Sequence, residues 1–235
     1  MKITRVTPIF CDAVWRAFTF VKVETDEGLV GYGECTDNSS AFGVGGCVRD
    51  LESRLIGKDP RAVERLYREM SHRFQHNPGG IAQKAIAGIE IALWDIKAKA
   101  LNVPLYELFG GPVNDKIRIY WSHCGTYRVR NPELYPDKPA LKTYDDIAAL
   151  GEEVAASGYT ALKTNILTPG EPPRMLWSME QNIDTGILKT IDRLMSTFRK
   201  AVGDKIDLCL DLNFNFKTDG FIQIARVVEP YNLMW

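Results

Sequence analysis

The sequence predicts two successive parts, an α+β part over residues 1–113 and a part of alternating strands and helices over residues 114–235. The first part begins with strand-like alternation of apolar and polar residues and continues with helical periodicity. The second part repeats strand and helix at short spacing, which is typical of a parallel sheet with crossover helices. A length of 235 residues suits one large domain or two ordinary ones.

Three antiparallel strands are expected at the start of the first part. Apolar residues alternate over residues 3–11 and 18–25, and residues 29–34 continue as a third strand. Gly28 lies in the turn before this third strand, where a positive φ is expected.

A loop and two helices are expected next. Residues 36–46 are polar and rich in glycine, which predicts a mobile loop. Asp59 can cap a first helix, whose apolar positions keep helical spacing to Phe74. A second helix covers about residues 81–100 and ends before Pro104, because proline cannot continue a helix.

The second part is expected to begin near Val113. Thr143 and Asp146 form a capping box at the start of one helix. The predicted order is strand 117–123, helix 143–157, strand 161–165, a long loop, helix 184–202, strand 206–211, a helix from a Thr218 cap to Val228, and a strand beginning at Leu233.

Composition excludes several classes of partner. The net charge of −1 gives no polybasic face for nucleic acid or an anionic membrane. No apolar run reaches membrane-spanning length, and the N-terminus does not resemble a signal peptide. The five cysteines are odd in number and lack a CxxC pair, which indicates free thiols in the cytoplasm. His72 and His76 lack the glutamate of HExxH, so we expect surface residues rather than zinc ligands.

Polar side chains stand at the ends of the predicted parallel strands, where α/β proteins gather ligands. A carboxylate with neighbouring amides suits Mg²⁺, and a lysine one strand away can stabilise negative charge or act as a base. By spacing alone, a terminal Asp is more often a cap or turn former, and a strand-end Lys is more often solvated. The three strand ends offer Tyr120, Ser122, His123 and Cys124; Lys163, Thr164 and Asn165; and Asp211, Asn213 and Asn215.

Three motifs together resemble the N-terminal signature of the enolase superfamily, in its mandelate racemase and muconate-lactonizing branch. They are GYGE at residues 31–34, GIEIALWDIKAKA at residues 88–100 and PLYELFGG at residues 104–111. The resemblance covers essentially the whole chain. It implies an α+β capping domain over residues 1–113, followed by the first part of a TIM-type (β/α) barrel over residues 114–235, with strands 1 to 3 and the start of strand 4.

The resemblance also implies a chemistry. Relatives hold Mg²⁺ with three carboxylates at the ends of successive barrel strands and remove the proton α to a carboxylate. Two negative charges then build up on one carboxylate group, and a divalent cation with a nearby ammonium can stabilise them.

The family's site residues carry over to several positions of this sequence. Asp211 matches the first metal ligand, and Asn213 matches a residue that lies beside the metal or a substrate hydroxyl. Lys163 matches the first lysine of the family's K-x-K motif. Asn165 departs from the second lysine, because an amide can orient a hydroxyl but cannot take a proton at neutral pH.

This departure counts against a two-base racemase and against a lysine-dependent cycloisomerase. Several acid-sugar dehydratases of the superfamily lack the second lysine. The leading hypothesis is therefore a Mg²⁺-dependent lyase that dehydrates a sugar acid. The alternatives are a racemase, epimerase or cycloisomerase of the same superfamily, or a non-catalytic truncated member.

Further contacts follow from the resemblance. Residues 12–16 and 36–46 match the capping-domain loops that choose the substrate, so Trp15 and Arg16 are candidates for contact with the distal end of a sugar acid. For both residues, a solvated loop is expected at least as often as a contact with substrate. His123 is a candidate for substrate contact, although a packed histidine is the commoner case. We expect a homo-oligomer, since octamers and dimers both occur among relatives.

The chain stops at Trp235, just as a strand begins. The other two metal carboxylates and the family's His–Asp base pair are expected beyond this point. We therefore expect the printed chain to be part of a longer protein and to be inactive alone. A natural truncation acting as a scaffold or partner subunit is the alternative.

Overall fold

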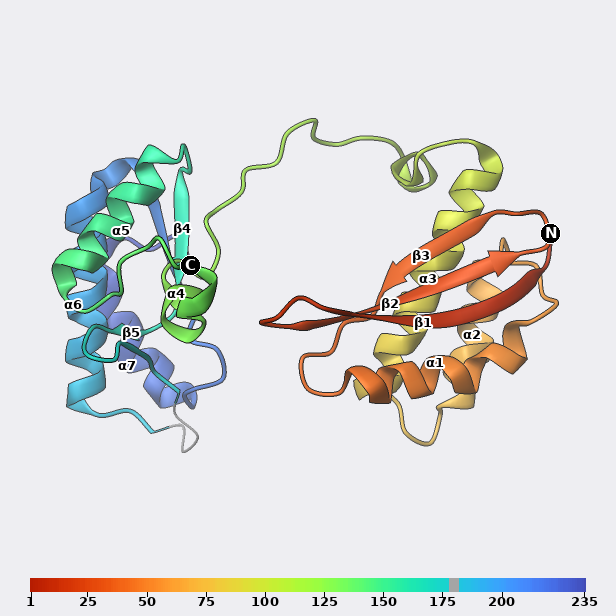
Figure 1. Cartoon of the computed structure of the whole chain (residues 1–235), viewed down its shortest axis with the longest axis horizontal. Coiled ribbons are helices and arrows are strands. Elements are labelled where there is room, and N and C mark those ends of the chain that lie inside the picture. The colour runs from red at the N-terminus through yellow and green to blue at the C-terminus, as the bar shows by residue number, and fades with distance from the viewer. Residues whose placement is uncertain (178–181) are drawn as a thin grey trace. The chain divides into compact units, whose positions relative to one another are not determined.

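A computed structural model describes residues 1–177 and 182–235. These residues form two compact units, Met1–Asp115 and Lys116–Trp235, and each unit is described by itself (Figure 1). The boundary expected at Val113 lies just before this division.

The first unit contains an antiparallel sheet of three strands in the order β1-β2-β3. Its strands are β1 (Ile3–Asp12), β2 (Ala17–Thr25) and β3 (Val30–Glu34), which confirms the three predicted strands. Gly28 has a φ of 81° in the turn before β3, as expected. Alternate residues of β2 are buried because only one face of the sheet meets the core.

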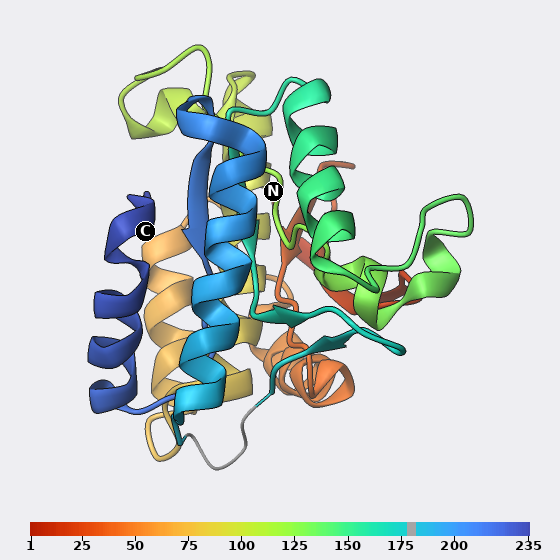
Figure 2. The same ribbon diagram turned by 90° about the vertical axis from the view of Figure 1, so that its left-hand side faces the viewer.

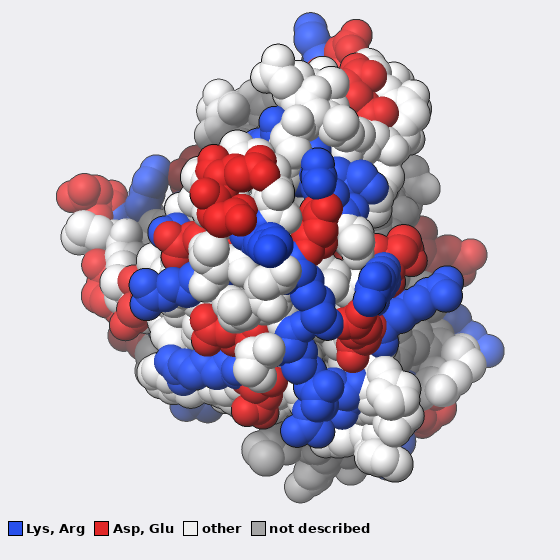
Figure 3. Space-filling model, turned by 90° about the vertical axis from the view of Figure 1, so that its right-hand side faces the viewer, with Lys and Arg blue, Asp and Glu red and all other residues white. Residues whose placement is uncertain are grey.

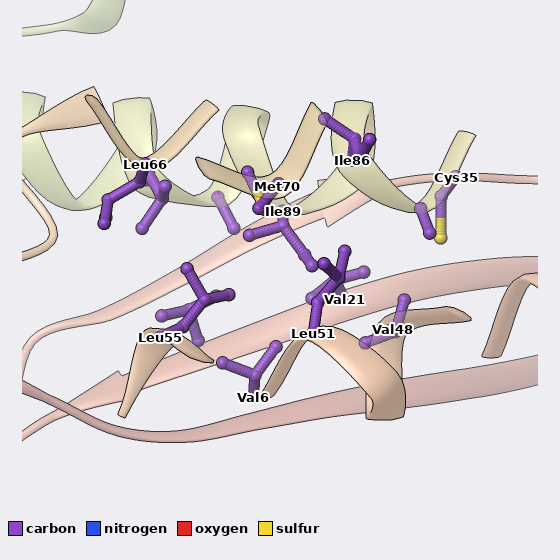
Figure 4. Packing of buried hydrophobic residues seen from close by; sticks show 14 of the residues in the cluster. Val6, Val21, Cys35, Val48, Leu51, Leu55, Leu66, Met70, Ile86 and Ile89 are labelled. Carbon is purple, nitrogen blue, oxygen red and sulfur yellow. The ribbon is translucent and has the colours of Figure 1, made fainter. Parts of the chain in front are cut away.

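Helices α1 (Ala41–Leu55) and α3 (Gly80–Leu101) pack against this sheet, and α2 (Val63–Arg73) packs against α3. Figure 4 shows Leu51 of α1 and Ile89 of α3 pointing toward Val6 and Val21 of the sheet. All four side chains are buried, so they form the shared core of the unit. The short 3₁₀ helix η1 (Leu105–Phe109) follows α3.

The loop predicted over residues 36–46 is wrong from Ala41 onward, because α1 begins there. One of the glycines that suggested a loop serves packing. Gly45 faces β1, and a Cβ atom at this position would lie 2.4 Å from Cζ of Phe10. The helix can therefore approach the strand closely only with glycine at this position.

The start predicted for the next helix is also wrong. Helix α2 begins at Val63, and Ala62 is its N-cap residue. The carboxylate of Asp59 instead accepts hydrogen bonds from the backbone N–H and the guanidinium of Arg61. Helix α3 confirms the prediction for residues 81–100 and ends at Leu101, followed by the C-cap residue Asn102 in a left-handed conformation.

A close contact between β3 and α3 explains two glycines of the GYGE motif. A Cβ atom at Gly31 would lie 2.1 Å from the carbonyl oxygen of Ala92, and one at Gly33 would lie 2.0 Å from that of Gly88. No side chain fits at either position, so the strand rests directly on the helix backbone.

The second unit is built on parallel pairing between β4 (Ala161–Thr164) and β7 (Asp207–Leu210). Trp121 pairs with Leu162 on one side of β4. On the far side of β7, the backbone N–H of Met234 donates to Leu208 O at 2.8 Å. The spatial order is therefore the segment at Trp121, β4, β7 and the segment at Met234, which is the order of the chain.

The strand predicted over residues 117–123 is wrong except at Trp121, which forms an isolated bridge to β4 before the chain turns at residues 122–125. Backbone pairing with β4 begins only at Trp121, which exchanges hydrogen bonds with Ala161 and Lys163. Ile117 and Ile119 are 80% and 64% exposed. Their alternation resembles a strand, but no neighbouring backbone pairs with them in the described residues.

Helices α5 (Tyr144–Ala156), α6 (Thr185–Val202) and α7 (Thr218–Val228) lie side by side, with α6 in the middle (Figure 2). The capping box of Thr143 and Asp146 at the start of α5 is confirmed. Thr218 is the first residue of α7 rather than its cap, so the predicted cap is wrong.

Short elements complete the second unit. The predicted long loop contains a two-stranded antiparallel hairpin, and its residues 178–181 lie outside the described part of the chain. The short elements are α4 (Thr126–Arg130), β5 (Leu167–Thr168), β6 (Arg174–Met175) and the 3₁₀ helices η2 (Pro132–Leu134), η3 (Gly203–Lys205) and η4 (Glu229–Tyr231).

Acidic and basic side chains are interspersed over the face of the molecule drawn in Figure 3. Among the described residues, every helix is too short or too polar to cross a membrane.

Candidate functional site

The centre of the candidate site is an ion pair between Lys163 and Asp211. Lys163 lies on β4, and Asp211 directly follows β7, its parallel neighbour. The Lys163 Nζ and Asp211 Oδ2 atoms are 2.8 Å apart, and the side chains are only 10% and 26% exposed. Parallel pairing brings these strand ends together, so the structure joins two residues that the sequence places far apart.

Asp211 is held as a carboxylate. Burial alone would raise the pKa of Asp211, but hydrogen bonds from Lys163 and from the backbone N–H of Asn213 outweigh it and lower that pKa below its ordinary value. The Asn213 N–H donates to Asp211 Oδ1 at 2.9 Å. Both carboxylate oxygens therefore accept a hydrogen bond.

The Asp-x-Asn-x-Asn sequence at this strand end forms a turn. Asn213 has a φ of 53°, in the left-handed region that asparagine tolerates better than most residues. Asn215 is buried, and its Nδ2 donates to the carbonyl oxygen of Leu212 at 2.9 Å. The amides thus shape the backbone that presents Asp211.

Asn165 connects three strand ends. It follows β4, is 2% exposed, and its Nδ2 donates to the backbone oxygen of Asp211 at 3.0 Å. Its Oδ1 accepts a hydrogen bond from the hydroxyl of Thr126 at 2.7 Å and lies 3.3 Å from Nδ1 of His123. The side chain predicted to orient a substrate hydroxyl has both ends of its amide bonded within the protein.

A tight turn after the first strand end delivers His123 and Thr126 to this amide. His123 has a φ of 51°, and its carbonyl oxygen accepts from the Thr126 N–H at 2.9 Å. Gly125 is also left-handed, and a Cβ atom there would lie 2.7 Å from Leu167 Cδ1. The His123 ring contacts the ring of Tyr127 at a centroid distance of 4.9 Å.

The backbone beside the ion pair is fixed by two hydrogen bonds. Cys124 N–H donates to the Lys163 carbonyl oxygen at 2.7 Å, and the Thr164 hydroxyl donates to the Cys124 carbonyl oxygen at 2.9 Å. The side chain of Thr164 is fully buried. The first two strand ends are therefore held together beside Lys163.

Aromatic rings flank the ammonium of Lys163. The ring centroids of Tyr120 and Trp235 lie 6.0 and 5.9 Å from its Nζ, which is within the range of a cation–π contact. A hollow of about 400 Å³ opens beside Asp211; its lining includes Asn213, Phe221, Ile224, Leu233 and Trp235.

The side chains at these strand ends meet part of the needs of Mg²⁺. Within residues 1–177 and 182–235, no three His, Cys, Asp or Glu side chains converge as a metal site. Asp211 supplies one carboxylate at the strand ends, and carboxylate oxygens are ligands that Mg²⁺ prefers. Asp211 therefore fits as one ligand of a magnesium site, not as a complete site.

The structure brings together five of the predicted site residues, and the other two belong to the first unit. Lys163, Asn165, Asp211, Asn213 and His123 gather in the second unit. Trp15 and Arg16 belong to the first unit, where the Arg16 guanidinium lies 4.7 Å from the centroid of the Trp15 ring. Their predicted contact with substrate stays a prediction.

Two residues of this network were missed by sequence reasoning. Thr164 was noted only as part of a strand end, and Thr126 was not considered. Thr126 is 39 residues from Asn165 along the chain, so only the fold reveals their contact.

The described residues define the class of protein: an α+β domain followed in the chain by a β/α unit with polar groups at the carboxyl ends of its parallel strands. Residues 12–110 match the family described as mandelate racemase / muconate lactonizing enzyme, N-terminal domain. The chain belongs to the enolase superfamily, in the mandelate racemase and muconate-lactonizing branch. The fold is that of the superfamily's capping domain and the first part of its barrel.

Curated relatives include proteins named D-galactonate dehydratase. The relative from Xanthomonas campestris pv. campestris (strain B100) is 32% identical over 231 residues, which cover 98% of this chain and 53% of the relative. The relative from Ralstonia pickettii (strain 12J) is 33% identical with the same coverage. The chain thus spans about half the length of these relatives.

Solved structures of relatives resemble the whole chain. A protein from Burkholderia xenovorans strain LB400, provisionally named L-alanine-DL-glutamate epimerase, is 34% identical with a TM-score of 0.92, over 100% of this chain and 61% of that one. A second structure of a protein so named was solved with magnesium and fumarate. A provisionally named dehydratase from Mesorhizobium loti is 30% identical with a TM-score of 0.85, over 100% of this chain and 59% of that one.

Proposed function

We propose that the complete protein is a Mg²⁺-dependent hydro-lyase that dehydrates a sugar acid, with D-galactonate as the first substrate to test. The observation that carries this proposal is the Lys163–Asp211 pair, an ammonium and a carboxylate 2.8 Å apart at the ends of adjacent parallel strands. The relatives named D-galactonate dehydratase support the choice of substrate class.

The proposed reaction starts with transfer of the proton on C2 of the sugar acid to a base. The C–H electron pair moves into the carboxylate, which then carries two negative charges. The hydroxyl on C3 leaves with its bonding electrons and takes up a proton to form water. The resulting enol gains a proton from solvent at C3 and becomes a 2-keto-3-deoxy acid.

The side chains of this site suit the charged stage of that reaction. The ammonium of Lys163 is nearly buried, and charge stabilisation is stronger where water is excluded. When bound, Mg²⁺ would supply a divalent charge for the same purpose, and Asp211 would be one of its ligands. Asn213 would lie beside the metal or a substrate hydroxyl.

An epimerase is the second candidate, favoured by the name given to the Burkholderia relative. Epimerisation needs one group to remove the proton and a second group to return one to the opposite face. Asn165 stands where relatives carry a second lysine, and its amide is engaged with Thr126 and Asp211. This arrangement favours dehydration over a two-lysine exchange.

The proposal extends to assembly and location. We propose a homo-oligomer in the cytoplasm, with Trp15, Arg16 and His123 contributing to substrate contact. The five cysteines are free thiols in the structure, which is compatible with a reducing compartment.

A screen of sugar acids tests the proposed function. The complete gene product should form keto acid from at least one sugar acid with Mg²⁺, and none after removal of the metal with EDTA. Asp211→Asn should abolish turnover, while the exposed Glu171→Gln should leave it unchanged. Metal-independent turnover, full activity of Asp211→Asn, or no product from any sugar acid would refute the proposal.

A further inference from the structure

We propose that Asn165 is a positioning residue whose amide fixes the proton of neutral His123 on Nδ1 and so sets the imidazole's hydrogen-bonding role. Three neighbouring strand ends bring the donor and acceptor groups of Asn165, Thr126 and His123 together.

The hydrogen bond to Asp211 fixes the orientation of the Asn165 amide. Asn165 Nδ2 is 3.0 Å from the backbone oxygen of Asp211, and a carbonyl oxygen can only accept. The NH₂ group must therefore face Asp211. The amide oxygen consequently faces the other way, toward the turn after the first strand end.

The amide oxygen then determines which ring nitrogen of His123 carries the proton. It accepts from the Thr126 hydroxyl at 2.7 Å and lies 3.3 Å from Nδ1 of His123. An amide oxygen has lone pairs only, so a neutral ring in this position bonds to it through Nδ1–H. Nε2 is then the acceptor nitrogen of His123.

The ring is held in this position from both sides. The turn of His123 and Thr126 is closed by a backbone hydrogen bond of 2.9 Å, and the ring contacts Tyr127. Asn165 itself is almost fully buried, so water does not compete for its oxygen. The tautomer is therefore built into the strand ends and does not depend on a ligand.

A lysine at position 165 would not fit this network. Its ammonium carries three donors and no acceptor, so it could not receive a bond from Thr126 or from His123. It would also place a second cation in a buried space next to Lys163. Asn165, Thr126 and His123 therefore form a matched set.

The consequence for catalysis rests on the proposed function. With the proton on Nδ1, Nε2 is matched to a donor such as a hydroxyl and mismatched to an acceptor. Asn165 would then determine which kind of group His123 can pair with, without touching that group itself.

Nitrogen NMR tests the tautomer directly, without substrate or metal. The chain contains three histidines, and His72 and His76 are exposed, so the His123 signals are assigned by their loss in His123→Gln. Spectra recorded at about pH 8.5 compare the two neutral tautomers of the ring. The proposal predicts that His123 carries its proton on Nδ1.

Two variants distinguish the effect of the Asn165 amide on the His123 tautomer from the effect of its neighbour Thr126. Asn165→Leu removes the acceptor and should shift His123 toward the Nε2–H tautomer. Thr126→Val removes the other donor but leaves the amide bonded to Asp211, so the Nδ1–H tautomer should persist. An Nε2–H tautomer in the unmodified protein would overturn the proposal, as would an unchanged Nδ1–H tautomer in a folded Asn165→Leu variant. Neither result depends on dehydratase activity, so a failure here is distinct from a failure of the proposed function.

Discussion

Lys163 and Asp211 form an ion pair of 2.8 Å although 48 residues separate them in the chain. The pair exists because β4 and β7 run parallel and end side by side. Its members are more buried than a surface pair, so their stability contribution and their proposed chemical role can both be measured by substitution.

Removing one member of this pair should destabilise the protein. Lys163→Met leaves Asp211 without its cation, and Asp211→Asn leaves a nearly buried ammonium without its anion. Each change should lower the free energy of unfolding by about 1–3 kcal/mol, less than a fully buried pair because Asp211 is partly exposed. Urea denaturation measures the loss.

The double variant provides the control for the pair. Lys163→Met combined with Asp211→Asn leaves no unpaired charge, so its loss should be smaller than the sum of the two single losses. The exposed pair of Lys142 and Glu171 offers a matched comparison, and Glu171→Gln should change stability by less than about 1 kcal/mol. Additive losses would show that the two charges do not interact.

Substitution by alanine should have opposite effects on stability at Gly33, in the close contact between β3 and α3, and at Gly46, outside it. Gly33→Ala places a methyl group against the carbonyl oxygen of Gly88 and should cost about 1–3 kcal/mol or more. Gly46 lies in α1 with open space around it, so Gly46→Ala should raise stability by about 0.5–1 kcal/mol. Thermal unfolding compares the two. Equal effects of both substitutions would contradict the close approach.

The cysteines should differ sharply in reactivity. Cys11 is exposed, whereas burial raises the pKa of Cys35 to about 11 and that of Cys124 to about 12. The thiolate is the reactive form, so Cys11 should react first with a thiol reagent at pH 8. Cys35 and Cys124 should react only as the protein unfolds. Mass spectrometry locates the label, and rapid labelling of Cys124 in the folded protein would contradict the structure.

Glu153 predicts a specific dependence of stability on pH. Burial alone would raise its pKa, but hydrogen bonds from Arg128 and Lys138 outweigh burial and lower that pKa. A carboxylate with a lowered folded pKa adds stability above its unfolded value of about 4.5 and loses it as the pH falls through the folded value. Stability should therefore decrease below about pH 4.5.

Substitution of Glu153 isolates this contribution. Glu153→Gln leaves the guanidinium of Arg128, which is 7% exposed, without its anion and should cost about 1–3 kcal/mol at pH 7. The loss should shrink as the pH falls below 4.5, because the carboxylate of the unmodified protein is then protonated. Glu152→Gln, at an exposed neighbour, should have little effect at any pH. A pH-independent loss for Glu153→Gln would rule out the ionic role.

The sequence predicted correctly those elements that are encoded within one short stretch of the chain. The capping box of Thr143 and the long apolar stripe of α3 are encoded within one helix, and both were predicted correctly. Helix α1 was missed because Gly45 has the local appearance of a loop residue. The glycine at position 45 is explained by its contact with Phe10 on β1, and a contact between two elements leaves no local sequence pattern.

The candidate site was predictable in outline for the same reason. Strand ends of a parallel sheet gather in space, so Lys163 and Asp211 could be placed together from the sequence and the family resemblance. The hydrogen bonds of Asn165 could not, because they depend on the turn that brings Thr126 and His123 to it. Side-chain partners across strands are set by tertiary packing rather than by spacing along the chain.

The most direct test of the proposed dehydration is an NMR assay in D₂O with the complete gene product, D-galactonate and Mg²⁺. Its mass is first compared with the 26.5 kDa of the printed chain. The account predicts a 2-keto-3-deoxy acid that carries one solvent deuterium at C3, and no product with Asp211→Asn. Recovery of sugar acid with deuterium at C2 and no keto acid would contradict dehydration and indicate an epimerase instead.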